Sequence, residues 1–144
     1  MKKKKELTYQ QKKEKARKRC VKKAKEINKI ESKRTCAYCG ATNRMTHSHH
    51  LISEGLNPAM SADLDNLICL CWLHHLGGLK FVSSKTFSFH GTPGEANNWF
   101  EDKYPERKKE LKERSWKSPT LTIGFWESKE EELDKKLKSI NNKE

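Results

Sequence analysis

The stretch CLCWLHH, residues 69–75, places two cysteines and two adjacent histidines within one short segment. Cys71 and His74 are separated by two residues, as are Cys36 and Cys39 further upstream, and 31 residues lie between the two pairs. Four nitrogen and sulfur ligands in two close pairs are typical of a closed, tetrahedral zinc site. The sequence therefore predicts a zinc ion that joins two distant parts of the chain.

The second histidine of this stretch needs a separate explanation. On a helical turn, Cys71 and His74 share a face, whereas His75 is rotated by about 100° from His74, because 3.6 residues make one turn. His75 therefore cannot bind the same ion, and we expect two back-to-back sites, one closed and structural, the other open. His49 and His50 form a second adjacent pair, which can give the open site a metal ligand and a proton acceptor.

The composition indicates a small hydrophobic core. Of 144 residues, 33% are hydrophobic and 35% are charged, and a small core usually needs a covalent or metal staple. The sequence has neither an apolar run long enough to span a membrane nor the apolar segment of a signal peptide. We therefore expect a cytoplasmic protein. Its five cysteines would be reduced, and close Cys/His spacings would favour metal sites over disulfides.

The positive charge of the chain is concentrated near the N-terminus. Residues 1–34 contain 16 Lys and Arg against 4 Asp and Glu, whereas the remaining 110 residues contain 15 of each. The segment is rich in helix formers, and Ala16, Val21 and Ala24 give it only a thin apolar stripe. We interpret it as a partly helical basic arm that binds the phosphates of a nucleic acid. The alternative is a solvated, flexible tail.

The chain divides into the basic arm (1–34), a Cys/His-rich centre (35–114) and a charged C-terminal part (115–144). Two antiparallel strands, a short crossing helix and appended helices would make an α+β fold. A Thr-Pro-Gly-Glu sequence at 92–95 predicts a capping box with a proline in the first helical turn. The predicted elements are strands at 43–52 and 66–71, a helical turn at 72–78, a hairpin at 80–89, helices at 92–104, 105–115 and 127–143, and an extended segment at 116–126.

Several conspicuous side chains are expected to have structural roles only. Cys69 falls among core residues of the second strand and should be buried and inert, and Cys20 should be a free thiol without a function. His47 could be a third metal ligand, but we favour a strand residue that forms a nearby hydrogen bond. His90 precedes a helix start and is expected to be structural.

The ordered motifs are similar to those of a known family. His-His at 49–50, Asn-Leu at 66–67 and Cys-x2-His-His at 71–75, preceded by Cys-x2-Cys at 36–39, resemble the HNH endonucleases, which have a ββα-metal fold. This resemblance covers about residues 36–76. The continuation FHGTPGEANNWFEDKYPE, residues 89–106, resembles a His-x2-Pro…Trp tail of phage HNH proteins, which include nucleases of DNA recombination.

The resemblance implies a metal-dependent endonuclease that hydrolyses the phosphodiester bonds of DNA. His49 and His75 would bind the catalytic divalent ion, Mg²⁺, Mn²⁺ or a similar metal. His50 would be the general base that activates water, and Asn66 would be the motif asparagine that holds the geometry of the site. From its position at the start of the second strand, the Asn66 amide can hold the loop or orient an imidazole. The structural Zn²⁺ would be bound by Cys36, Cys39, Cys71 and His74.

The sequence also departs from the family pattern. Many relatives have Cys at the position of His74, and Leu79 stands where some relatives have a third metal histidine, so two protein ligands are expected. The residues after the His-His pair, LISEG at 51–55, lack the usual basic side chain, for which Arg44 or Lys80 could substitute. A non-catalytic zinc-dependent nucleic-acid-binding adaptor and an RNase-type toxin remain alternatives. Metal-dependent nicking of plasmid DNA would distinguish them.

Overall fold

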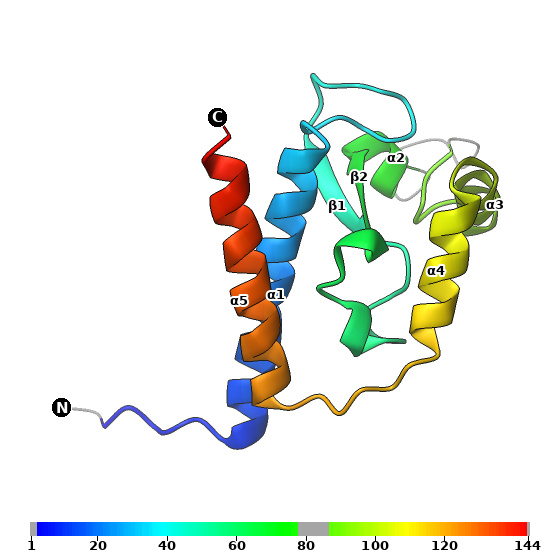
Figure 1. Cartoon of the computed structure of the whole chain (residues 1–144). Helices are drawn as coiled ribbons and strands as arrows, with labels where there is room; N and C mark the ends of the chain where they lie inside the picture. The colour runs from blue at the N-terminus through cyan, green and yellow to red at the C-terminus, as the bar shows by residue number, and fades with distance from the viewer. Residues whose placement is uncertain (1–2, 78–86, 144) are drawn as a thin grey trace.

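The computed structural model describes residues 3–77 and 87–143 and has the mixed α+β architecture that the sequence predicts (Figure 1). The regular elements are α1 (Tyr9–Glu31), β1 (Thr46–His50), η1 (Pro58–Met60), η2 (Leu64–Asn66), β2 (Leu67–Cys71), α2 (Trp72–Leu76), α3 (Pro93–Lys103), α4 (Pro105–Ser115) and α5 (Ile123–Asn141). The hairpin predicted at 80–89 lies mostly outside the described residues. Within those residues, no helix combines the length and the apolar character that a membrane crossing requires.

The two strands form an antiparallel sheet whose two faces receive different side chains. His47 lies opposite Leu70, and His49 lies opposite Ile68. Because side chains alternate along a strand, the histidines at 47 and 49 share one face, while Ser48 points to the other. The Ser48 hydroxyl donates a hydrogen bond to Asn28 Oδ1 of α1 at 2.6 Å. Helix α1 therefore covers the Ser48 face and leaves the histidines on the opposite face.

Helix α1 is packed into the fold and does not extend from it as an arm. Figure 1 shows α1 between α5 and the sheet. Cys20 and Ile27 widen the thin stripe that the sequence suggested, and the Cys20 thiol lies 3.1 Å from the carbonyl oxygen of Trp126. The buried cluster on this side contains Ala16, Cys20, Val21, Ala24, Ile27, Ala62, Leu67, Trp126 and Leu133. All three predicted parts of the chain contribute to this cluster, so the boundaries at 34 and 115 do not separate packing units.

A second buried cluster lies on the histidine side of the sheet, where α3 and α4 pack. It contains Cys36, Met60, Ile68, Leu70, Cys71, Phe89, Ala96, Phe100 and Leu111. Cys69 is buried with 2% of its surface exposed, as expected of an inert side chain. The two clusters together hold the sheet between α1 on one side and α3 and α4 on the other.

Two helix starts differ from the sequence predictions. Thr92 precedes α3 but forms no capping box, because its hydroxyl accepts a hydrogen bond from Ser88 N and donates one to Ser88 O, both at 3.0 Å. Helix α5 begins at Ile123, inside the segment predicted to be extended, because the Thr122 side chain accepts a hydrogen bond from Phe125 N at 3.1 Å. This bond satisfies one of the free N–H groups of the first turn.

Candidate metal centres

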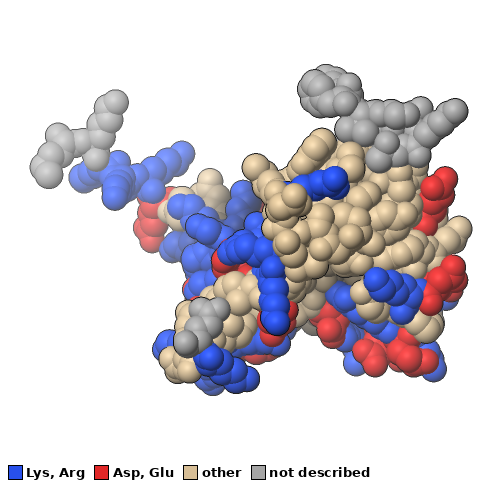
Figure 2. Space-filling view, turned by 90° about the horizontal axis from the view of Figure 1, so that it is seen from above, with Lys and Arg blue, Asp and Glu red and all other residues tan. Residues whose placement is uncertain are grey.

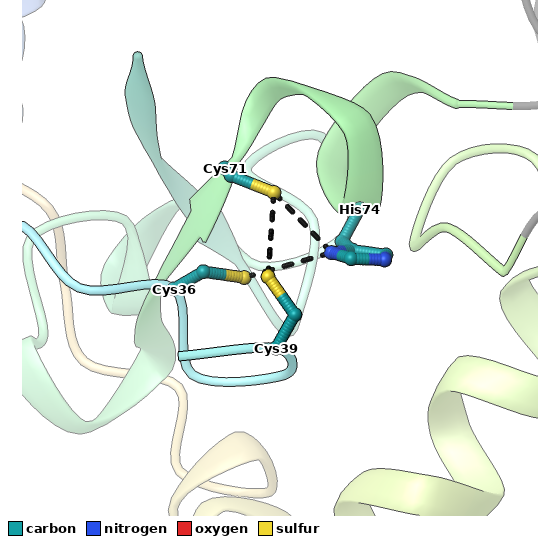
Figure 3. A group of neighbouring side chains, drawn as sticks. All are labelled: Cys36, Cys39, Cys71 and His74. Atoms are coloured by element: carbon teal, nitrogen blue, oxygen red, sulfur yellow. Dashed lines mark hydrogen bonds between the residues drawn. The ribbon is translucent and has the colours of Figure 1, made fainter. Parts of the chain in front are cut away.

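The four predicted zinc ligands converge at one point, which we call the closed centre: Cys36, Cys39, Cys71 and His74 (Figure 3). Cys39 Sγ and Cys71 Sγ are 3.9 Å apart, and His74 Nδ1 lies 3.2 Å from Cys71 Sγ and 3.8 Å from Cys36 Sγ. Two sulfurs bound to one tetrahedral zinc at about 2.3 Å would be about 3.8 Å apart. The group therefore has the spacing that one tetrahedral ion requires.

Backbone hydrogen bonds hold the first cysteine pair in place. Gly40 N donates to Cys36 O at 2.8 Å, and Cys36 N donates to Ala41 O at 3.0 Å. Gly40 has a φ of +72°, which glycine adopts without strain. Ala37 N donates to Cys69 O at 2.9 Å and so joins this turn to β2. The second pair follows directly, since Cys71 ends β2 and His74 lies in the first turn of α2.

At Cys71 and His74 of the closed centre the surroundings favour the protonation states that metal binding needs, whereas burial and the neighbouring thiols of Cys36 and Cys71 raise the pKa of Cys39. Burial opposes ionisation of Cys71, yet hydrogen bonds from the His74 backbone and from Arg44 lower the pKa of its thiol below the ordinary value. Burial and the charge of Arg44 lower the pKa of His74. A thiolate and a neutral imidazole are the forms that bind a metal ion. Arg44, a candidate for phosphate binding, thus lies at this centre, with Nη1 3.8 Å from Cys71 Sγ.

Three histidines form a second group, which we call the open centre: His49 from β1, His75 from α2 and His90 from the turn before α3. One nitrogen of each ring lies within 4.8 Å of those of the other two. His75 Nε2 and His90 Nε2 are 3.0 Å apart. Two nitrogens bound at right angles to one ion, each at about 2.1 Å, would also be about 3.0 Å apart. The open centre therefore fits an ion with several free coordination positions.

Backbone hydrogen bonds place His90 beside His75, where it is available as a ligand in addition to the structural role expected from the sequence. Phe89 N donates to His74 O at 2.8 Å, and His90 N donates to His75 O at 3.1 Å. These carbonyls belong to the last turn of α2, where no intrahelical donor is available to them. The pairing brings the exposed His90 ring to His75 and supplies a third imidazole, where the sequence suggested only two protein ligands.

His49 and His75 of the open centre are neutral near pH 7. Burial is the main cause that lowers the pKa of His49 to about 3, and the neighbouring His75 and His90 add to it. Burial likewise lowers the pKa of His75 to about 4, with His90 and His47 adding to it. Neutral imidazoles keep a lone pair available for a metal ion.

His47 belongs to neither centre and forms a hydrogen bond, as the favoured interpretation of the sequence proposed. Its Nδ1 lies 2.9 Å from Nδ1 of His75. Because one ring nitrogen of His75 is used here, the other, Nε2, is directed to His90 and the open centre. A hydrogen-bond partner on the ring nitrogen that does not face the metal, as His47 is for His75, orients a metal-binding histidine and selects its tautomer.

Asn66 holds the loop after β1, which is the role that the sequence suggested. Its side chain is fully buried. Oδ1 accepts a hydrogen bond from Ile52 N at 2.7 Å, while Nδ2 donates to Ile52 O at 3.0 Å and to Met60 O at 3.1 Å. One amide thus closes both ends of the segment between residues 52 and 60.

His50 lies on the other side of β1 from His49, in contact with this loop. Its Nε2 is 2.7 Å from the carbonyl oxygen of Ser61 and 3.2 Å from Glu54 Oε1. A carbonyl oxygen can only accept a hydrogen bond, so Nε2 carries the proton in the neutral ring. Nδ1 is then the nitrogen with a free lone pair, and His50 has the tautomer of a positioned proton acceptor.

Comparisons of the chain with family models, with curated proteins and with solved structures find no match. The two centres, the orientation of His50 and the distribution of charge are therefore the features from which a function can be inferred. The closed centre can hold a structural ion, because its four ligands leave no free position. The open centre has the three-ligand composition of a site that also accepts water or substrate.

Proposed function

We propose that this protein is a metal-dependent endonuclease of the HNH type that hydrolyses phosphodiester bonds of DNA. The observation that supports it most is the open centre, in which three imidazoles converge, one of them the exposed ring of His90. His50, which follows His49 in the chain and lies on the other side of β1, has one nitrogen bonded to a carbonyl and the other free. Metal ligands and a separate, oriented proton acceptor are the two elements that metal-assisted hydrolysis requires.

Zinc is the proposed occupant of the closed centre. Three thiolates and one imidazole in tetrahedral spacing select Zn²⁺ over harder ions. Its role would be structural, because it would join the turn at 36–41 to the junction of β2 and α2. That junction also carries His75, so the same ion would fix the position of one ligand of the open centre.

The open centre would bind the catalytic ion through His49, His75 and His90. When bound, a divalent ion supplies positive charge that stabilises a phosphodiester during its hydrolysis. The donor set of three imidazoles favours a transition-metal ion, whereas Mg²⁺ prefers oxygen ligands. We therefore expect Ni²⁺ or Zn²⁺ to support activity better than Mg²⁺.

His50 would act as the general base through Nδ1. The bond from Nε2 to Ser61 O fixes the ring and keeps the proton on Nε2. Nδ1 would take the proton of the attacking water. Asn66 supports this arrangement indirectly, because it binds Met60 O, next to Ser61 in the chain.

DNA is the proposed substrate because of the charge of the chain. The formal net charge is +12, and Lys and Arg crowd the side of the molecule that carries the N-terminal segment and α1 (Figure 2). Such a surface attracts the phosphate backbone and releases its counterions. A zinc-stapled adaptor would share this surface, so catalysis must be tested directly.

The test is nicking of supercoiled plasmid by the zinc-loaded protein with Ni²⁺, Mn²⁺, Mg²⁺ or no added ion. We expect nicking with the transition ions, and its loss in His49→Ala. The matched control is Leu76→Ala, an exposed change next to His75 that leaves all ligands in place. If the folded protein nicks plasmid with none of the ions, the nuclease proposal is wrong and the adaptor remains. Faster cleavage of RNA than of DNA would indicate a ribonuclease.

A further inference from the structure

The cations of α1 divide into two sets according to their partners. On one side, Arg19 and Lys23 pair with α5: Arg19 Nε lies 3.0 Å from Glu130 Oε2, and Lys23 Nζ lies 3.1 Å from Glu130 Oε1 and 2.7 Å from Asp134 Oδ1. Their charge is balanced inside the protein. These two residues therefore fasten the helices to each other and have little charge left for a phosphate.

The second set consists of Lys18, Lys22, Lys25 and Lys29. Their spacing of four, three and four residues places them within an arc of about 60° on the helix. Lys18 and Lys22 are exposed, and Lys25 and Lys29 are partly exposed. In the part of the chain that the structure describes, no carboxylate oxygen lies within 4.0 Å of these four ammonium groups. They form one continuous, uncompensated stripe.

A groove runs beside this stripe towards the loop after β1, which carries Glu54. It is lined by Arg17, Lys18, Val21, Lys22, Lys25 and Glu54. Glu54 connects the groove to the site, because its Oε2 binds Arg17 at 3.2 Å and its Oε1 lies 3.2 Å from His50 Nε2. The helix and the proposed general base thus meet at one carboxylate.

The far end of the stripe is fixed next to β1. Asn28 lies between Lys25 and Lys29 in the chain, accepts the hydrogen bond of Ser48 at 2.6 Å and donates to Leu67 O at 3.2 Å. Ser48 separates His47 and His49 in β1. The last two lysines of the stripe therefore lie beside the strand that carries the metal ligands.

We propose that Lys18, Lys22, Lys25 and Lys29 form a track that binds successive phosphates of one strand of duplex DNA and leads that DNA strand towards β1, which carries His49 and His50. The eleven residue-to-residue steps from Lys18 to Lys29 give a rise of about 16 Å along the helix. Along one strand of duplex DNA, with one phosphate per 3.4 Å of axis, this length corresponds to roughly five phosphates. The inference rests on the proposed function only for the destination of the strand; the binding itself is independent of cleavage.

The experiment compares two fourfold variants of the full-length, zinc-loaded protein. The first variant removes the stripe by combining four changes, Lys18→Ala, Lys22→Ala, Lys25→Ala and Lys29→Ala. The matched control removes the same charge from exposed positions on α4, on the segment after it and on α5. These positions are Lys109, Lys117, Lys135 and Lys138, each changed to Ala. Fluorescence anisotropy of a labelled duplex, without an added divalent ion, gives Kd over a range of salt concentrations.

Loss of the stripe should reduce the slope of log Kd against log salt by about 3, because each phosphate contact contributes about 0.9. The control should change the slope by less than 1. Equal changes in both variants, or an unchanged slope in the stripe variant, would overturn the track. Ala is a better helix former than Lys, so circular dichroism should show intact helices. A parallel set of Lys→Gln changes should give the same loss of slope.

Nicking measurements separate this inference from the proposed function. If both are correct, the stripe variant should show a KM raised at least tenfold near physiological salt, with a much smaller change in kcat. Should the wild type bind duplex DNA with the steep slope but fail to nick it with any ion, the nuclease proposal fails and the track stands. Should nicking occur and the slope be insensitive to the stripe, the track fails and the nuclease proposal stands.

Discussion

The two metal centres are built from adjacent residues and yet differ in almost every property. His74 and His75 follow each other in α2, but the helix turns one towards three thiolates and the other towards two imidazoles. The closed centre has two buried cysteines beside the exposed Cys39, whereas the open centre has two partly buried histidines beside the exposed His90. The difference shows how one helical turn can direct two adjacent histidines to separate groups of ligands.

The packing around the two centres suggests different consequences of their loss. Cys36 and Cys71 belong to the same buried cluster as Leu70 and Phe100, so the closed centre is continuous with the core. The three ligands of the open centre are only partly buried or exposed. We therefore expect changes at the closed centre to act on stability and changes at the open centre to act on chemistry.

The largest expected effect is the loss of a closed-centre thiolate. Cys71→Ser should abolish tight zinc binding and cooperative melting, because structural zinc contributes about 10 kcal/mol or more and a domain is stable by only about 5–15 kcal/mol. Zinc content and thermal melting by circular dichroism measure this. Cys69→Ala is the control, since Cys69 is buried beside Cys71 but binds no ion; it should remain folded. A Cys71→Ser protein that melts like the wild type would contradict a structural zinc.

The next effect separates the adjacent histidines. His75→Ala should lose at least a hundredfold of nicking activity and bind the catalytic ion weakly, while keeping its zinc and its melting temperature. His74→Ala should lose stability and zinc, since it opens the closed centre. Calorimetric ion binding, zinc analysis and melting of both variants test the assignment. The opposite pattern, a stable His74→Ala and an unfolded His75→Ala, would mean that the two centres have been exchanged.

His50→Ala should reduce nicking by about a hundredfold, the usual contribution of a general base, without weakening the binding of the ion. The reason is that His50 contacts Ser61 and Glu54 and is not a ligand. Single-turnover nicking as a function of ion concentration distinguishes it from His75→Ala. Excess ion should partly rescue His75→Ala and should leave His50→Ala inactive; rescue of both would make His50 a ligand.

A smaller effect is expected for His90→Ala. Two imidazoles remain, so the affinity for the ion should fall about tenfold, a moderate ligand effect, and excess ion should restore most of the activity. Titration of nicking with Ni²⁺ measures the shift. His90→Gln is an informative companion, since it keeps a polar side chain without the imidazole. Unchanged ion dependence in both variants would return His90 to the structural role that its sequence position suggested.

The smallest expected effect is on the pH dependence of protein stability, and it arises from the open centre when no ion is bound there. The folded pKa of His49 is lowered to about 3, mainly by burial, below an unfolded value of about 6.5. The unfolded chain therefore takes up the proton first, so the stabilising contribution is complete above about pH 6.5 and is lost as pH falls. Between pH 6.5 and 5, the unfolding free energy should drop by up to about 2 kcal/mol more in the wild type than in His49→Gln. Urea denaturation at both pH values, with the zinc centre filled, measures this change. If the unfolding free energy changes equally between the two pH values in the wild type and in His49→Gln, a buried neutral His49 is contradicted.

Much of the closed centre could be predicted from the sequence, because its geometry is local. Residues three apart on a helical turn share a face, so Cys71 and His74 follow from their spacing, and Gly40 marks the turn of the other pair. The alternation of β1 and the brace formed by Asn66 were also accessible from sequence patterns. The proposed chemistry still rests on these residues and their geometry, since no relative supports it.

The tertiary structure alone decided where distant segments meet. His90 reaches His75 because the backbone of residues 89 and 90 pairs with carbonyls at the end of α2, and no local pattern encodes that pairing. Helix α1 is part of the core because Trp126 and Leu133, more than a hundred residues away, cover its buried side. The sequence by itself determined the ligand spacings, the element types and the charge. Which cations stay free and which histidines converge depended on long-range packing, because hydrophobic burial is not directional and does not specify its partner.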